Sequence, residues 1–117
     1  MTELEMKKRT KAFALRVVKL VNAPPTGFLG RRLGDQLLRS GTSVAANYRA
    51  ACRARSKADF INKLRIVEEE GDESALWMEL FIEGGLVSQR RLGKLLDEAN
   101  QLTAIMVASR KSTLGRR

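Results

Sequence analysis

Apolar and small side chains recur every three or four residues along most of this 117-residue chain. Between residues 57 and 83 the recurring positions are Phe60, Leu64, Val67, Gly71, Ser74, Met78 and Phe81. The same steps connect Leu33, Leu37, Ser40, Val44, Asn47 and Ala51, and then Leu92, Leu95, Ala99, Leu102, Met106 and Ser109. Steps of three and four mark one face of an α-helix, and no alternating run predicts a strand.

Three interruptions divide the chain into four predicted helices. The prolines of "NAPPTG" (22–27) end the first helix. Ser56, followed three residues later by Asp59, is the pattern of a capping box that opens the third. The segment "EGGLVS" ends the third helix with glycine and supplies Ser88 to start the fourth. The predicted helices cover residues 3–22, 28–53, 57–83 and 88–111, so we expect an all-α protein, a single domain over residues 1–117 that forms an antiparallel up-down four-helix bundle.

The segment "SGTSVAANYRAA" (40–51) uses small residues where larger apolar ones would bury more area. Small side chains let helices approach closely, and we expect tight packing at Gly41, Ser43, Ala45, Ala46, Gly71, Ser74 and Ala75. Packing alone does not explain an amide in this segment, because a buried amide without partners costs about 1–3 kcal/mol. We predict that Asn47 and Ser43 form a buried polar pair that fixes helix register or assembly state.

The charge of the chain indicates which kind of molecule it binds. The net charge is +9 and the sequence pI is about 10.5, which is typical of proteins that meet polyanions such as RNA, DNA or an anionic surface. The charge is also segregated, with +11 on residues 1–65, −7 on residues 66–85 and +5 on residues 86–117. Seven basic residues of the first helix and the second connection are the candidate nucleic-acid contacts: Lys7, Lys8, Lys11, Arg49, Arg53, Arg55 and Lys57. The alternative is that these residues form an ordinary solvated surface.

The acidic third helix has two interpretations. The residues Glu70, Glu73, Trp77 and Leu80 lie three or four apart and combine carboxylates with the single tryptophan, which favours an oligomer interface. The alternative is a solvated helix face. A ring requires one patch to meet a different patch on the next subunit, so basic residues of a neighbour's first or second helix would answer these carboxylates.

Little in the sequence indicates an enzyme. The chain has no histidine and one cysteine, which excludes a disulfide or a Cys/His zinc site within one subunit and favours a reducing cytoplasm. Cys52 is the one residue that suggests enzymatic chemistry, because neighbouring arginines are expected to lower the pKa of its thiol. We therefore expect no enzyme, no catalytic or metal-ligating residues and no cofactor. The longest apolar stretch, "FALRVVKLV", is interrupted by Arg16 and Lys19, so no membrane span is expected.

The stretch from residue 36 to residue 64 resembles the signature of a known family. Its matching positions are Gln36, Leu37, Arg39, Ser43, Val44, Asn47, Tyr48, Arg53, Ser56 and Phe60. The family comprises four-helix-bundle proteins encoded in intervening sequences of bacterial 23S ribosomal RNA genes. Many members have Asn-Ile-x-Glu-Gly where this chain has Asn47-Tyr48-Arg49-Ala50-Ala51.

The resemblance implies an up-down bundle that assembles into a homo-oligomeric ring, a pentamer, without enzymatic activity. The accessory protein of diversity-generating retroelements is similar to this family and binds nucleic acid together with its reverse transcriptase. Two functional hypotheses follow for this chain. The first is an oligomeric nucleic-acid-binding adaptor that recognises the phosphate backbone or shape of RNA or DNA. The second is a protein-interaction scaffold, such as a reverse-transcriptase accessory, that binds no nucleic acid itself.

Overall fold

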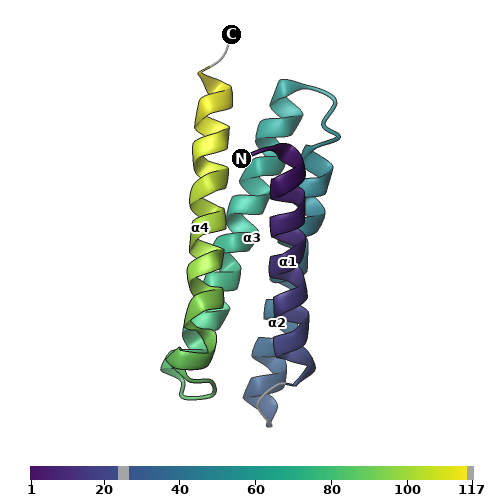
Figure 1. Cartoon of the computed structure of the whole chain (residues 1–117). Coiled ribbons are helices and arrows are strands. Elements are labelled where there is room, and N and C mark those ends of the chain that lie inside the picture. Colours follow the sequence, from purple (N-terminus) through teal and green to yellow (C-terminus); the bar gives the residue numbers. More distant parts are fainter. Residues whose placement is uncertain (24–26, 116–117) are drawn as a thin grey trace.

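Four antiparallel helices form an up-down bundle in the computed structural model, which describes residues 1–23 and 27–115 (Figure 1). The helices are α1 (Glu3–Asn22), α2 (Phe28–Ala51), α3 (Lys57–Glu83) and α4 (Gln89–Leu114). The predicted fold class is therefore confirmed. The bundle measures 51 × 20 × 19 Å. Helices that follow one another in the chain pack together, whereas α1 touches α4 only slightly.

Local capping explains where the helices begin and end. The Ser56 hydroxyl accepts the backbone N–H of Asp59 at 3.0 Å, and Ser88 caps α4 in the same way through Arg91 at 3.1 Å. The Asp59 carboxylate accepts from the N–H of Arg55 and not from Ser56, so the predicted capping box lacks its reciprocal bond. The prolines predicted to end α1 lie outside the described residues, and α1 ends at Asn22.

A complete capping box opens α1 and was not predicted. The Thr2 hydroxyl accepts the Glu5 N–H at 3.1 Å, and the Glu5 carboxylate accepts the Thr2 N–H at 3.2 Å. At the end of α3, Gly85 adopts a positive φ of 75°, a conformation that glycine takes without strain. These local signals explain why the predicted helix bounds agree closely with the observed ones.

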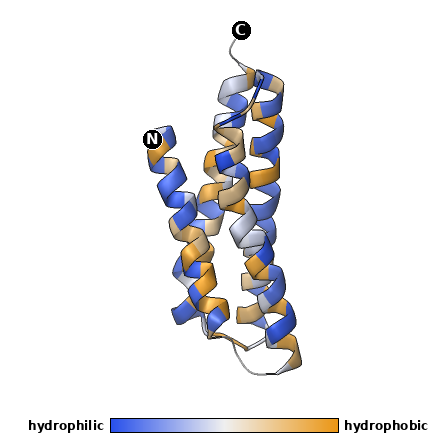
Figure 2. Cartoon of the chain, turned by 90° about the vertical axis from the view of Figure 1, so that its right-hand side faces the viewer, coloured by the Kyte–Doolittle hydropathy of each residue, from blue (hydrophilic) through white to orange (hydrophobic). Residues whose placement is uncertain are grey.

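The predicted apolar faces meet in one core, and Figure 2 shows the hydrophobic positions interspersed with hydrophilic ones along each helix. Close helix approach depends on two glycines. A Cβ at Gly41 would lie 2.8 Å from a methyl of Val17, and a Cβ at Gly71 would collide with Thr103. The predicted close approach is confirmed at these glycines, which join α2 to α1 and α3 to α4.

The polar pair of the core differs from the predicted one. Asn47 and Ser43 are only half-buried, and the Asn47 amide donates to the Ser43 carbonyl of its own helix at 2.9 Å. Their predicted burial between helices is therefore wrong, because the amide is satisfied locally. The buried inter-helix pair is Ser40 and Ser74, whose hydroxyls are 2.9 Å apart and fully excluded from solvent.

Tyr48 takes the buried position that had been expected for the amide, and it is 8% exposed. The inward stripe of α2 runs through Ser40, Val44, Tyr48 and Ala51.

Among the described residues, no helix carries an apolar stretch long enough to cross a membrane.

Candidate nucleic-acid interface

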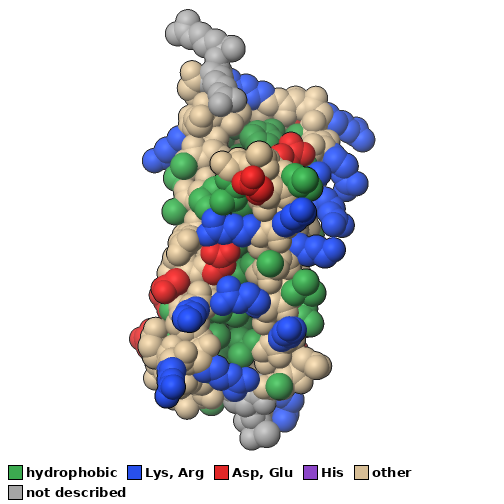
Figure 3. Space-filling view, in the orientation of Figure 1, with side chains coloured by type: hydrophobic (Ala, Val, Ile, Leu, Met, Phe, Trp, Pro, Cys, Tyr) green, Lys and Arg blue, Asp and Glu red, His purple; other side chains and the backbone are tan. Residues whose placement is uncertain are grey.

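One end of the bundle gathers basic side chains. The α2–α3 connection lies at this end, together with the start of α1, and Figure 3 shows lysine and arginine crowding the upper right of the molecule. Arg53 and Arg55 border an open depression together with Lys63, Ala50 and Asp59. The structure thus brings the C-terminal part of the predicted basic set to the same end as its N-terminal lysines.

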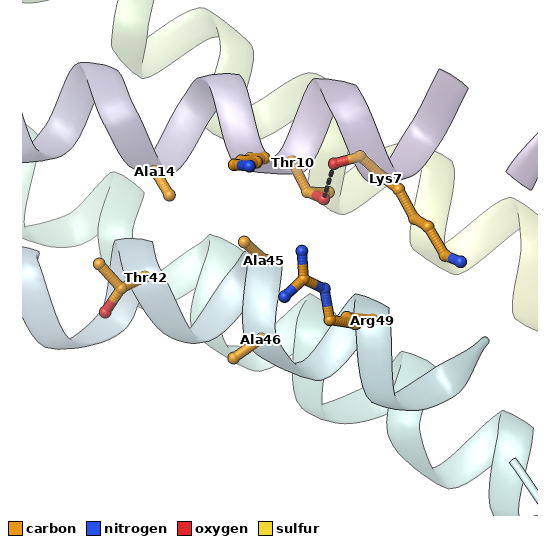
Figure 4. Close-up of a pocket in the computed structure, with 8 residues that line it drawn as sticks. Lys7, Thr10, Ala14, Thr42, Ala45, Ala46 and Arg49 are labelled. Carbon is orange, nitrogen blue, oxygen red and sulfur yellow. Dashed lines mark hydrogen bonds between the residues drawn. The ribbon is translucent and has the colours of Figure 1, made fainter. Parts of the chain in front are cut away.

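A groove between α1 and α2 leads away from this end. It encloses about 280 Å³ and is lined by Lys7, Thr10, Lys11, Ala14, Thr42, Ala45, Ala46 and Arg49 (Figure 4). The groove is open because three of the four side chains that α2 contributes to its lining are alanine or threonine. The small residues Ala45 and Ala46 were predicted to pack helices tightly, but they are partly or fully exposed and shape this groove.

Cations border the groove on both sides. The Arg49 guanidinium extends from α2 toward α1 in Figure 4, where Lys7 lies on the α1 side. Lys11, which also belongs to α1, lines the groove as well. Lys7 forms an exposed ion pair with Glu3 at 3.5 Å. Within residues 1–23 and 27–115, neither Lys11 nor Arg49 forms an ion pair, so their charges are available to an anion.

The hydroxyl groups of the groove are directed to their own helices. Thr10 donates to the backbone carbonyls of Met6 and Lys7 at 3.0 and 3.1 Å, and Thr42 donates to the Leu38 carbonyl at 2.7 Å. The floor therefore presents few free donors, and the polar chemistry of the groove is concentrated in its cations.

Lys8 stands apart from this groove. It is exposed on the outer face of α1, away from the residues that line the groove. Lys57 is exposed at the first position of α3, beside Arg55 and the cap residue Ser56. The predicted set is therefore a surface at one end of the bundle with Lys8 on an adjoining face.

Three carboxylates of α3, those of Glu68, Glu70 and Glu73, are paired with arginines of the same chain. Arg39 of α2 binds Glu70 at 3.2 Å and also pairs with Glu73. The Trp77 indole N–H donates to Glu73 at 3.3 Å, and Leu80 is 41% exposed. The predicted interface residues thus lie together, but an arginine of their own chain answers the two carboxylates, and their role between subunits stays a prediction.

Two further ion pairs connect helices. Arg110 of α4 binds Glu68 through two bonds of 2.6 and 3.1 Å. Arg9 of α1 binds Glu98 of α4 through bonds of 2.8 and 2.7 Å. Three arginines that face other helices are therefore neutralised, whereas Lys11, Arg49 and Arg53 form no ion pair within the described part of the chain.

The thiol does not have the environment that its sequence neighbours suggested. Burial raises the pKa of Cys52, and the adjacent Glu3 carboxylate raises it further. Burial likewise raises the pKa of Tyr48, with a contribution from Cys52. The expectation of a thiol pKa lowered by neighbouring arginines is wrong, because burial and the Glu3 carboxylate of α1 together raise this pKa.

Sequence reasoning missed Thr10, Ala14 and Thr42 of the groove and Lys63 of the depression. A signal existed, since both Ala45 and Ala46 lie three or four residues from Thr42 and from Arg49, on a second face of the same helix. That face could not be assigned without knowing which side of α2 packs against α1.

Among the described residues, no group of three or more carboxylate, cysteine or histidine side chains could hold a metal ion.

Comparison with known proteins identifies the family of the chain and solved structures similar to it. The family model described as "23S rRNA-intervening sequence protein" matches residues 2–108. The chain is similar to a crystal structure from Bacteroides thetaiotaomicron, described as a protein with unknown function from the S23 ribosomal protein family. The two share 30% identity with a TM-score of 0.83, over 95% of this chain and 99% of that one. No curated protein matches the chain.

Proposed function

We propose that this chain, which belongs to the family of 23S rRNA-intervening sequence proteins, is a non-enzymatic, oligomeric adaptor that binds the phosphate backbone of RNA or DNA. The contacts are made by the basic end of the bundle and by the adjoining groove between α1 and α2. The principal residues are Lys7, Arg49, Arg53, Arg55 and Lys57, with Lys11 at the rim of the groove and Lys8 on the adjoining face of α1.

One observation carries this proposal: the positive charge of the chain is divided into a neutralised part and an available part. Arg9, Arg39 and Arg110 are held by carboxylates of neighbouring helices. Within the described ranges, Arg49 and Arg53 form no ion pair and lie where a long anion could follow the surface. An extended polyanion is the ligand that such a surface attracts.

The mode of recognition follows from the side chains available. Lysine and arginine contact phosphates and release condensed counterions, which gives binding that weakens steeply with salt. Base readout requires amides or bidentate arginines in a groove, and base stacking requires aromatic platforms. The threonine hydroxyls of the groove are directed to backbone carbonyls, and no aromatic residue lines the groove or the depression among the described residues. Recognition of backbone or shape therefore fits this surface best.

Assembly strengthens such binding. Each copy in an oligomer contributes the same basic end, so a polyanion long enough to reach several copies is bound at more points without any new chemistry. The affinity then depends on the number of copies engaged as well as on each cation.

The test compares two charge reversals of equal size. Arg53→Glu with Arg55→Glu changes the basic end, whereas Arg90→Glu with Arg91→Glu changes the start of α4 at the opposite end of the bundle. Binding to unrelated RNA and DNA duplexes is measured by fluorescence anisotropy across a salt series. We expect the first variant to bind all sequences more weakly by the same factor and to lower the salt slope by about one unit for each phosphate that is no longer neutralised.

The matched reversal at residues 90 and 91 should retain the wild-type slope. Equal weakening in both variants would show that net charge, and not the basic end, governs binding. Wild-type protein that binds neither duplex at about 50 mM salt would contradict the proposal and favour the scaffold hypothesis.

A further inference from the structure

The outer face of α1 carries a stripe that the bundle leaves open. The stripe consists of Leu4, Lys8, Lys11, Leu15 and Val18, all exposed and separated by steps of four and three. Leu15 is 54% and Val18 40% exposed, which is unusual for two apolar residues one turn apart. We call these five residues the α1 stripe.

A complementary stripe lies on the outer face of α3. It consists of Glu69, Asp72, Leu76, Leu80 and Glu83, which are all exposed and likewise separated by three or four residues. Leu76 is 45% and Leu80 41% exposed. We call these residues the α3 stripe. Within the described ranges, Lys8, Lys11, Glu69 and Asp72 form no ion pair, although other lysines, arginines and carboxylates of these helices do.

The two stripes cannot meet within one chain. In the described part of the bundle α1 and α3 occupy diagonal positions and do not contact each other, and both run in the same direction (Figure 1). Their levels along the bundle are fixed through α2. Val17 packs against Gly41, and the neighbouring Ser40 bonds Ser74, so Val17 and Ser74 lie at nearly the same level.

Three consecutive positions of the two stripes match when the helices are placed side by side in parallel. A constant difference of 61 in residue number sets Lys8 opposite Glu69, Lys11 opposite Asp72 and Leu15 opposite Leu76. Two lysines thus face two carboxylates, and leucine faces leucine one turn further on. For the contact to form in this register, the second copy must be displaced along the helix axis from the level that α1 and α3 share within one chain. The displacement is four residues, about 6 Å.

We propose that the α1 stripe of one copy docks in parallel on the α3 stripe of a second copy in this register. The inference deepens the proposed function, because it rests on the assembly named there and assigns its contact surface. The contact joins two different patches, and the parallel helices orient successive copies in the same direction, which is the arrangement that closes into a ring when the rotation permits.

This contact also separates two roles among the lysines of α1. Lys8 and Lys11 become partners of a neighbour's carboxylates, whereas Lys7 and Arg49 remain in the groove between α1 and α2. The basic end formed by Arg53 and Arg55 is not covered by either stripe. Backbone binding by the assembled protein therefore rests on this end together with Lys7 and Arg49, and Lys8 and Lys11 of the proposed set are used for assembly instead.

A charge swap tests the contact. Lys8→Glu with Lys11→Glu places four carboxylates opposite one another, and Glu69→Lys with Asp72→Lys places four ammonium groups there. We expect each double variant to shift the mass measured by light scattering at micromolar concentration from the wild-type assembly toward the 13.1 kDa chain. The quadruple variant restores opposite charges across the contact and should recover the wild-type mass.

Two controls keep the outcomes distinct. Circular dichroism shows whether each variant retains its helices, and Arg90→Glu with Arg91→Glu should keep the wild-type mass because these residues lie in neither stripe. Double variants that keep the wild-type mass, or a quadruple variant that stays dissociated while helical, would overturn the inference alone. A monomeric wild-type chain would overturn the inference and the proposed assembly, while duplex binding measured separately would still decide backbone recognition.

Discussion

The two sides of α2 have similar small residues and different surroundings. On the side toward α3, Ser40 and Val44 are fully buried and Arg39 is paired with carboxylates. On the side that borders α1, Thr42 and Ala46 line an open groove below the charge of Arg49. A small side chain therefore has two distinct uses in one helix: it allows a neighbour to approach, or it leaves room that no neighbour fills.

The largest expected effect separates these two uses. Gly41→Val places methyl groups where Val17 already lies, since even a Cβ there would be 2.8 Å from a Val17 methyl. Overpacking of this kind costs about 1–3 kcal/mol. Ala46→Leu, on the groove side, should change the free energy of unfolding by less than about 0.5 kcal/mol because the residue is exposed. Urea denaturation measures both, and equal destabilisation would contradict the distinction.

A smaller effect is expected from the buried hydroxyl pair. Ser40→Ala removes the bond between α2 and α3 and should cost about 0.5–1.5 kcal/mol. Combining it with Ser74→Ala should cost less than the sum of the two single changes, because both remove the same inter-helix bond. Ser43→Ala is the matched control on the half-buried side of α2, and its side chain forms no bond among the described residues. A control that is as destabilising as Ser40→Ala would show that burial does not decide the effect.

The smallest effect concerns the two arginines of α2. Arg39→Ala should destabilise the bundle only slightly, because Arg39 joins two carboxylates but is half-exposed, and exposed ion pairs are weak. The cost should shrink in about 1 M salt, where exposed charges are screened. Arg49→Ala should leave the unfolding free energy unchanged and lower the affinity for duplexes. Thermal unfolding at two salt concentrations, together with the anisotropy assay, checks both variants. Any destabilisation by Arg49→Ala would place this arginine among the residues that hold the fold.

The helix bounds could be predicted because their causes are local. Ser56 caps the start of α3 and Ser88 caps the start of α4, and glycines follow the end of α3. The failure at Asn47 has a geometric cause. The prediction followed strict steps of four and three, which imply 3.5 residues per turn, whereas an α-helix has 3.6. Over two turns the inward face drifts, and it reaches Tyr48 instead of the amide.

The groove and the thiol could not be predicted, because both depend on which helix lies beside α2. Ala46 resembles Gly41 in sequence, and only the position of α1 decides that one is covered and the other open. The environment of Cys52 depends on Glu3, which is close in space and distant in sequence. The charge segregation, in contrast, was visible from the sequence, since it depends only on residue order.

The order in which the helices pack has a consequence for folding kinetics. Most of the packing between helices joins neighbours in the chain, whereas α1 and α4 are connected mainly through the bond between Arg9 and Glu98. Such a topology closes short loops first, and proteins with mostly local contacts fold rapidly. We therefore expect the α1–α4 contact to form after the folding transition state, so that Arg9→Ala accelerates unfolding while the folding rate stays nearly unchanged.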